Sequence, residues 1–290
     1  MSNKLKVSMV QMQVTDQVEV NVQKAVDLVR EAAKSKPDVI VLPENFHLMT
    51  TNQDFFDKAE TIDGPTITRL KELAKELDTY IVAGTMKLKE AGEAKLKNIC
   101  CVINPKGEIQ DIYNKVHTFN ARVGDVQYQG SKVEDAGNQL IVTNIKGVPV
   151  GLSVCFDIRF PEMFRILALK GAKVILVPAI FMLHTGKDHW EVLLRARAIE
   201  NQVYIVAPAT YGKFPPNDQW SYGRSMAVDP WGLVIAQSSD RDDVLTVDLD
   251  LDWVEDVRKR VPTLTQRRTD LYRLEEIQQT EGVALNGSRN

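Results

Sequence analysis

The sequence predicts an α/β fold made of two similar halves, and two observations support this prediction. Short, continuously apolar segments alternate with segments of helical periodicity, which is typical of buried strands separated by helices. The order of the segments also repeats, because DVIVLPE at residues 38–44 resembles KVILVPA at residues 173–179, with Pro43 and Pro178 in register. Two copies are too few for a solenoid, so we expect two β-α-β halves related by a quasi-twofold axis.

The first half begins with an alternating segment, residues 5–12, which predicts a strand. Apolar residues at Val22, Val26 and Val29 then follow a helical spacing, and the SKP sequence ends this helix. The remaining elements expected in this half are a strand at 38–44, a helix at about 66–78, a strand at 79–85 and a hairpin over 99–115.

The second half follows the same order of elements. They are a strand at 148–154, a helix at 161–172, a strand at 173–179, a helix at 188–202 and a strand at 203–210. Two later strands, around 225–228 and 233–235, are separated by the sequence DPWG and add antiparallel pairing. No Gly-, Ser- or Pro-rich linker divides the chain, so we expect one domain over residues 1–273 and a polar tail over residues 274–290.

Composition and charge argue against several classes of function. Lys and Arg number 36 against 39 Asp and Glu, a net charge of -3 with no basic run, which disfavours a nucleic-acid or anionic membrane partner. No stretch approaches the roughly 20 apolar residues of a membrane span, and MSNKLKVSMVQ does not read as a signal peptide. Three cysteines do not make a disulfide framework. We therefore expect a cytoplasmic protein that binds neither nucleic acid nor membrane.

Three reactive side chains fall where predicted strands end. Glu44 and Cys155 each end an apolar strand, and Lys115 follows the second strand of the hairpin. Strand ends of α/β sheets are common places for ligands and catalytic groups. A thiol can attack a carbonyl or nitrile carbon, a carboxylate can move the proton, and an ammonium can hold the oxyanion. A helix is expected to follow Cys155, so the Phe156 amide is a candidate second oxyanion donor.

The residues around these positions resemble the nitrilase, or carbon–nitrogen hydrolase, superfamily. The resemblance rests on LPENF at 42–46, YNKVHTF at 113–119 and CFDIRFPE at 155–162, in this order, and it extends over residues 5–273. It continues in HTGKDHWEVLLRARAIENQVYIV, in GRSMAVDPWG and in RRTDLY. CFDIRFPE in particular is similar to the branch that hydrolyses small linear amides, which includes omega-amidases and deaminated-glutathione amidases.

The resemblance implies a fold, a mechanism and an assembly. The fold is a four-layer α-β-β-α sandwich with an internal pseudo-twofold repeat, which fits the repeat in the sequence. Glu44 is the implied general base, Lys115 the oxyanion-stabilising ammonium, and Cys155 the nucleophile that forms a thioester and releases ammonia. No metal or other cofactor is required, and the implied assembly is a homodimer.

One departure from the family pattern concerns a second glutamate. Family members commonly carry it between the Lys and Cys motifs, whereas the matching stretch here is Tyr128-Gln129-Gly130-Ser131, with Gly130 in its place. Asp125, Glu134 and Asp135 lie nearby, and nothing in the sequence favours any of them. A weakly catalytic or purely binding homologue is therefore one alternative. Hydrolysis of N-carbamoyl amino acids or of nitriles, within the same superfamily, is another.

Several other residues near these motifs could have either a structural or a functional role. Arg159 could bind a substrate carboxylate or form a structural ion pair, and His189 is a further candidate at the substrate site. His117 and His189 are the possible partners of Cys155 in a rival Cys–His dyad. The histidines offer no spacing typical of a metal site. Three residues are expected to be structural: Asp157 as an acceptor for backbone amides, and Cys100 and Cys101 as core side chains.

Overall fold

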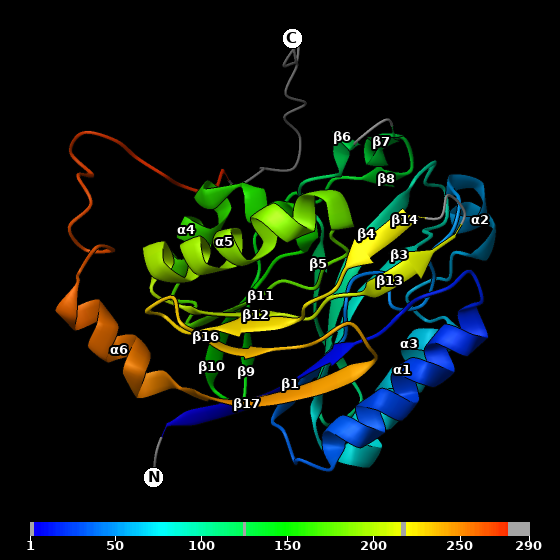
Figure 1. The fold of residues 1–290 in the computed structure, drawn as a ribbon, viewed down its shortest axis with the longest axis horizontal. Coiled ribbons are helices and arrows are strands. Elements are labelled where there is room, and N and C mark those ends of the chain that lie inside the picture. Colours follow the sequence, from blue (N-terminus) through cyan, green and yellow to red (C-terminus); the bar gives the residue numbers. More distant parts are fainter. Residues whose placement is uncertain (1–2, 124–125, 216–218, 278–290) are drawn as a thin grey trace.

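Two β-sheets stack face to face in the centre of the molecule, and helices cover their outer faces (Figure 1). The computed structural model describes residues 3–123, 126–215 and 219–277. Helices α1 and α3 lie against one sheet, and α4 and α5 lie against the other. This arrangement confirms the predicted four-layer α-β-β-α sandwich.

The first sheet has seven strands, of which three neighbours in its centre are parallel. In spatial order they are β17 (Asp243–Asp250), β1 (Lys4–Gln11), β2 (Val39–Val41), β3 (Tyr80–Leu88), β4 (Leu96–Ile103) and β5 (Ile109–Asn114), with β8 (Glu134–Asp135) paired to the start of β4. Strands β4 and β5 are antiparallel additions at one side, and β17 is antiparallel to β1 at the other.

The second sheet repeats this plan with six strands. In spatial order they are β16 (Val234–Gln237), β15 (Met226–Val228), β12 (Tyr204–Ala207), β11 (Val174–Leu176), β10 (Val148–Leu152) and β9 (Val142–Ile145). Strands β10, β11 and β12 are parallel, and an antiparallel strand follows on each side. The order β1-β2-β3-β4 thus corresponds to β10-β11-β12-β15, which confirms the internal repeat.

The described helices connect strands along the sequence, apart from the last one, and two of them begin with a proline. They are α1 (Val18–Ala33), α2 (Asn52–Lys58), α3 (Pro65–Leu77), α4 (Pro161–Leu169), α5 (Leu183–Asn201) and α6 (Leu251–Arg260). Proline suits the first turn because its missing N–H has no intrahelical acceptor there. None of the helices in the described ranges is both long and apolar enough to span a bilayer.

The remaining elements are two ribbons and two short 3₁₀ turns. The ribbons pair β6 (Asn120–Val123) with β7 (Val126–Gln129), and β13 (Tyr211–Phe214) with β14 (Gln219–Tyr222). The turns are η1 (Gly130–Lys132) and η2 (Cys155–Arg159).

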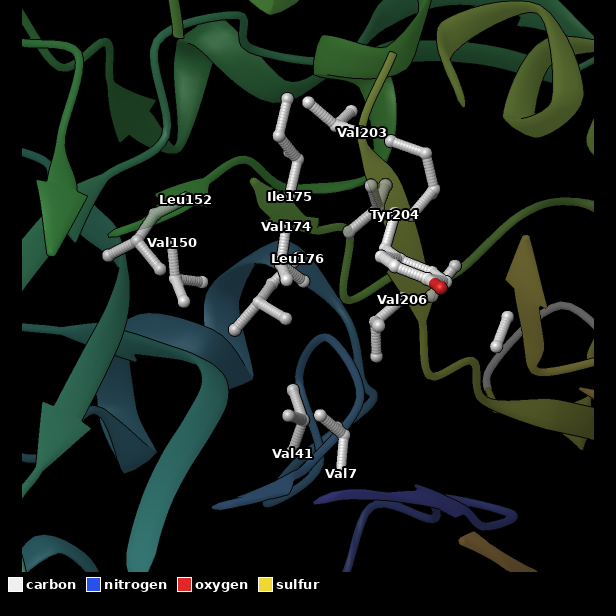
Figure 2. Packing of buried hydrophobic residues seen from close by; sticks show 14 of the residues in the cluster. Val7, Val41, Val150, Leu152, Val174, Ile175, Leu176, Val203, Tyr204 and Val206 are labelled. Carbon is white, nitrogen blue, oxygen red and sulfur yellow. The ribbon is translucent and has the colours of Figure 1, made fainter. Parts of the chain in front are cut away.

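The main core fills the space between the two sheets. Val7 and Val41 of the first sheet face Val150 and Leu176 of the second, and all four are essentially inaccessible to solvent (Figure 2). The central strands β2 and β11 have only three residues each, and every one is buried. Burial on both faces explains why these strands are continuously apolar rather than alternating.

The predicted helix at 188–202 differs from the structure at its start. Helix α5 begins at Leu183, because Gly186 lets the helix approach β14 closely: a Cβ there would lie 2.6 Å from the Cβ of Tyr222. The first turn carries no apolar periodicity, so the sequence did not reveal it.

Glu276 lies in the predicted polar tail. Its carboxylate accepts from the Leu140 N–H at 2.7 Å and pairs with Lys170, also at 2.7 Å. The rest of the predicted tail, from residue 278, lies outside the described residues.

Candidate active site

The structure brings Glu44, Lys115 and Cys155 together. The ammonium of Lys115 donates to Oε1 of Glu44 at 2.8 Å, and both side chains are almost fully buried. The peptide of Ile180 joins this pair to the thiol. Its N–H donates to Oε2 of Glu44 at 2.9 Å, and its carbonyl accepts from Sγ of Cys155 at 3.2 Å.

The internal repeat explains how these groups meet. Glu44 follows β2 and Ile180 follows β11, so the bond between them joins corresponding strand ends of the two halves. Gly84 on β3 approaches the backbone just before Glu44 so closely that a Cβ would lie 2.0 Å from the Leu42 carbonyl oxygen. This position therefore requires glycine, and its contact fixes the path of the chain into Glu44.

Cys155 is the first residue of η2, at the sharp turn that follows β10. Its φ is +47°, in the left-handed region that non-glycine residues rarely adopt, and its N–H donates to the Pro178 carbonyl at 2.9 Å. Such a conformation costs about 1–2 kcal/mol and is over-represented at functional sites. The turn places the thiol beside the Ile180 carbonyl and Glu44.

The electrostatics favour a neutral thiol beside a charged pair. Burial raises the pKa of the Cys155 thiol well above its usual value, and the Glu44 carboxylate raises it further. Burial alone would lower the pKa of Lys115, but the charge of Glu44, together with smaller contributions from Cys155, Glu134 and Asp157, outweighs burial and raises that pKa above the usual range. The resting site therefore contains a thiol, a carboxylate and an ammonium.

A cavity of about 570 Å³ opens onto these groups. Its volume falls within the range of roughly 300–1,000 Å³ that small-molecule sites occupy. Besides the three predicted residues, the lining combines apolar, amide and charged side chains. They include Lys87, Asn98, Phe119, Gly130 and Glu134.

The other predicted site residues lie apart from the cavity lining. The Phe156 ring packs edge-on against Phe119 and Phe160. Arg159 lies over the Phe181 ring at 5.1 Å, and its Nη1 is 3.3 Å from Nδ1 of His189. Neither Arg159 nor His189 lines the cavity, so their direct contact with substrate stays a prediction.

The rival dyad would use His117, which lies against Asp157 and Phe160 and does not line the cavity. Nδ1 of His117 is 2.8 Å from Asp157, and its ring stacks on Phe160. Asp157 also accepts from the backbone N–H groups of Val154 and His117 and from the Tyr113 hydroxyl. The predicted structural role of Asp157 is therefore confirmed, and His117 is one of the groups that it binds.

Cys100 and Cys101 are core residues, as predicted. Cys100 packs in the core between the sheets, and Cys101 packs against the helices on the outer face. Burial raises the pKa of the Cys101 thiol to about 12 and raises that of Cys100 further. Neither thiol is a competing nucleophile at neutral pH.

The sequence did not single out four residues that complete the site. They are Ile180, Asn98, Lys87 and Glu134. Asn98 donates from Nδ2 to Oε1 of Glu44 at 3.3 Å, and Lys87 forms a buried ion pair with Glu134 at 2.6 Å. Glu134 was one of three acids near Gly130 in sequence. Of the other two, Asp135 pairs with the part-exposed Lys95, and Asp125 lies outside the described residues.

Comparison with known proteins gives consistent matches over most of the chain. The carbon–nitrogen hydrolase family model matches residues 6–259. The chain is 36% identical to omega-amidase NIT2 of Mus musculus over 93% of this chain and 97% of that protein. It is 34% identical to the Homo sapiens omega-amidase NIT2, again over 93% and 97%.

Solved structures agree with these matches. The NitFhit protein of C. elegans superposes with a TM-score of 0.89 at 35% identity, covering 94% of this chain and 67% of that one. Nit3 of Saccharomyces cerevisiae, a nitrilase-superfamily member, gives a TM-score of 0.83 at 29% identity, covering 91% and 97%. The family match and these relatives show that the chain belongs to the carbon–nitrogen hydrolase family, as an amide hydrolase of the omega-amidase-like branch.

Proposed function

We propose that the protein hydrolyses small linear carboxamides of the omega-amide type through a thioester on Cys155. The observation that carries the proposal is the buried arrangement in which Glu44 bonds to both Lys115 and the Ile180 peptide beside the Cys155 thiol. The similarity to omega-amidases supports the substrate class.

The first half of the reaction forms the thioester. Sγ of Cys155 attacks the amide carbon while its proton passes to Glu44, because the thiol is neutral at rest. Lys115 and the Phe156 N–H hold the oxyanion. When the tetrahedral intermediate collapses, the C–N bond breaks and the nitrogen takes the proton from Glu44 to leave as ammonia.

The second half hydrolyses the thioester. Glu44, again a carboxylate, takes a proton from water as the water oxygen attacks the thioester carbon. Collapse of this intermediate breaks the C–S bond, and the proton on Glu44 returns to Sγ. The products are the free carboxylic acid and the starting enzyme, so each turnover consumes one water and releases one ammonia.

The experiment is ammonia release from a panel of five compounds. They are a 2-oxo ω-amide, succinamate, glutamine, an N-carbamoyl amino acid and a simple nitrile. We expect release from one or more ω-amides and none with Cys155→Ala. Equal release by Cys155→Ala would contradict the mechanism. Turnover of the carbamoyl compound or the nitrile alone would move the substrate class to another branch.

The assembly and the cellular location also stay predictions. We propose a homodimer in the cytoplasm, as expected from the sequence and the resemblance.

If the folded protein releases no ammonia from any compound of the panel, the result would favour the binding homologue instead.

A further inference from the structure

A second buried ion pair lies in the cavity beside the predicted catalytic groups. Nζ of Lys87 is 2.6 Å from Oε2 of Glu134, and their side chains are only 10% and 4% exposed. Both line the cavity. Burying two charges is costly unless they interact closely with each other and with polar neighbours, so this ion pair marks a candidate functional position.

The backbone holds this pair against Lys115 and Asn98. Lys87 lies opposite Asn98 in the pairing of β3 with β4, and β8 places Glu134 opposite Leu96 at the start of β4. The Lys115 N–H donates to the Asn98 carbonyl at 2.9 Å. The four polar residues therefore lie on adjoining segments of one sheet.

Charge and hydrogen bonding connect the pair to the predicted general base. Asn98 Nδ2 and Lys115 Nζ both donate to the same oxygen, Oε1 of Glu44. Burial works to raise the pKa of Glu134, but Lys87 and Lys115 outweigh it and hold that pKa below its usual value. In turn, the Glu134 carboxylate favours the charged form of Lys115.

Gly130 leaves room for this carboxylate. A Cβ on Gly130 would lie 3.0 Å from the Phe119 carbonyl oxygen and 3.3 Å from Oε1 of Glu134. A side chain at 130 and the Glu134 carboxylate would thus compete for one corner of the cavity. The resemblance to the superfamily placed a glutamate at 130, whereas the structure places the carboxylate of Glu134 beside that position.

We propose that Glu134, anchored by Lys87, is a positioning residue for the amidase reaction and supplies from position 134 the carboxylate that Gly130 lacks. Glu134 holds the Lys115 ammonium charged and oriented toward the oxyanion, and the Asn98 amide links it to Glu44. The inference rests on the proposed function, because it concerns the same three groups.

The experiment compares four proteins: wild type, Glu134→Gln, Gly130→Glu, and the exchange variant Gly130→Glu/Glu134→Ala. We expect Glu134→Gln to lower kcat about 10- to 100-fold with little change in KM, because misplaced catalytic groups cost rate more than binding. Gly130→Glu alone should lower kcat, since two carboxylates then compete for one corner. The exchange variant should recover at least a third of the wild-type kcat.

The matched control is Asp135→Asn. Asp135 is the next residue of β8 and also carries an ion pair, 3.3 Å from Lys95, but both side chains are part-exposed. Its kcat should equal that of wild type. Wild-type kcat in Glu134→Gln would overturn the inference, and so would an exchange variant that folds but stays as slow as Glu134→Gln.

Alkylation of Cys155 by iodoacetamide gives a readout that needs no turnover. The reagent carries a carboxamide whose oxygen Lys115 would orient, so Glu134→Gln should slow alkylation and the exchange variant should restore it. If wild type hydrolyses no amide but shows this order of rates, the proposed function fails, whereas the positioning of Lys115 by Glu134 is still supported. Equal alkylation rates in all three proteins would contradict the inference.

Discussion

At the scale of single residues, the site places a thiol of raised pKa beside a carboxylate that can accept its proton. Cys155 is buried and faces Glu44, so its pKa lies well above the usual value, while Lys115 opposes this shift. A thiol of this kind reacts only when its proton is removed during attack. Glu44 therefore has two opposing effects: it suppresses the resting thiolate and makes the reaction possible.

This opposition leads to a prediction for Glu44→Gln. Removing the negative charge should lower the pKa of Cys155, because the carboxylate raises it both through space and by a hydrogen bond. The pH profile of Cys155 alkylation by iodoacetamide, followed by mass spectrometry, should move to lower pH. Amide turnover should nevertheless fall at least about 100-fold, since the proton acceptor is lost. An alkylation profile that stays in place or moves to higher pH would contradict the proposed electrostatics.

A second residue-scale prediction concerns His47, which is fully buried. Neither ring nitrogen has a hydrogen-bond partner within the described ranges. Burial, with a smaller effect from Lys87, lowers the pKa of His47 from 6.5 to about 3. The unfolded chain thus binds a proton that the folded protein does not between about pH 3 and pH 6.5. Stability from this residue is complete above pH 6.5 and falls as the pH drops.

Chemical denaturation at pH 7.5 and pH 5 measures this effect. One pKa unit corresponds to about 1.4 kcal/mol. Because of His47, the unfolding free energy of the wild type should therefore be about 2 kcal/mol lower at pH 5 than at pH 7.5. In His47→Leu, the decrease in unfolding free energy between pH 7.5 and pH 5 should be smaller than in the wild type by this amount. His184→Gln, a change at an exposed histidine, is the control and should keep the wild-type dependence. Equal pH dependence in His47→Leu would show that His47 is not held neutral.

At the scale of elements, the path of the chain into Glu44 depends on Gly84 in β3. A Cβ at this position would lie 2.0 Å from the Leu42 carbonyl oxygen and 2.1 Å from that of Pro43. Gly84→Ala must therefore push the segment after β2 away. We expect a loss of about 3 kcal/mol in unfolding free energy, by urea denaturation, together with loss of turnover.

Gly92→Ala is the matched control for Gly84→Ala. Gly92 has nothing within 4 Å of an added Cβ but a φ of +85°. Its replacement should cost about 1–2 kcal/mol, from backbone conformation alone, and leave turnover unchanged. If both variants lose the same stability and both stay active, the close approach at Gly84 does not position Glu44.

The elements also show which parts of the site the sequence could predict. Glu44 and Cys155 could be found because each ends a locally visible apolar segment, and Lys115 because it follows the second strand of a recognisable hairpin. Glu134 could not, because β8 has two residues and exists only through its pairing with β4, far away in sequence. Lys87 lies in a strand whose predicted end, residue 85, came before it. Strand β17 and helix α6 were likewise not predicted, although β17 alternates apolar and polar residues and α6 carries an Asp N-cap followed by Leu251, Val254 and Val257 at helical spacing.

At the scale of the whole molecule, the site exists only where the two halves meet. Glu44, Lys115 and Glu134 come from strands of the first sheet, whereas Cys155 and Ile180 follow strands of the second. The fold class and the repeat were predictable because each half of the sequence contains strands and helices in the same order. The contact between Glu44 and the Ile180 peptide was not, because it depends on how the two sheets stack.

The predicted homodimer is the last property of the whole molecule to test. Helix α5 exposes Val192 and Ile199 at 66% and 51%, and Gly232 packs against Ile199 between Trp231 and Leu233, which are 54% and 62% exposed. Apolar side chains gathered on one helix face and its neighbouring turn are suited to an interface between two copies. We expect light scattering after size exclusion to give twice the chain mass of 32.6 kDa.

Variants on two helices decide whether this face forms the dimer. Val192→Asp/Ile199→Asp should give a monomer, because each carboxylate would be buried without a partner in the interface. The control is Val20→Asp on α1, where the side chain is equally exposed, at 56%, but lies on the helix layer of the other sheet. It should leave the dimer intact. A monomeric wild type would show the dimer prediction to be wrong, and a dimer that survives the double change but not Val20→Asp would move the interface to α1.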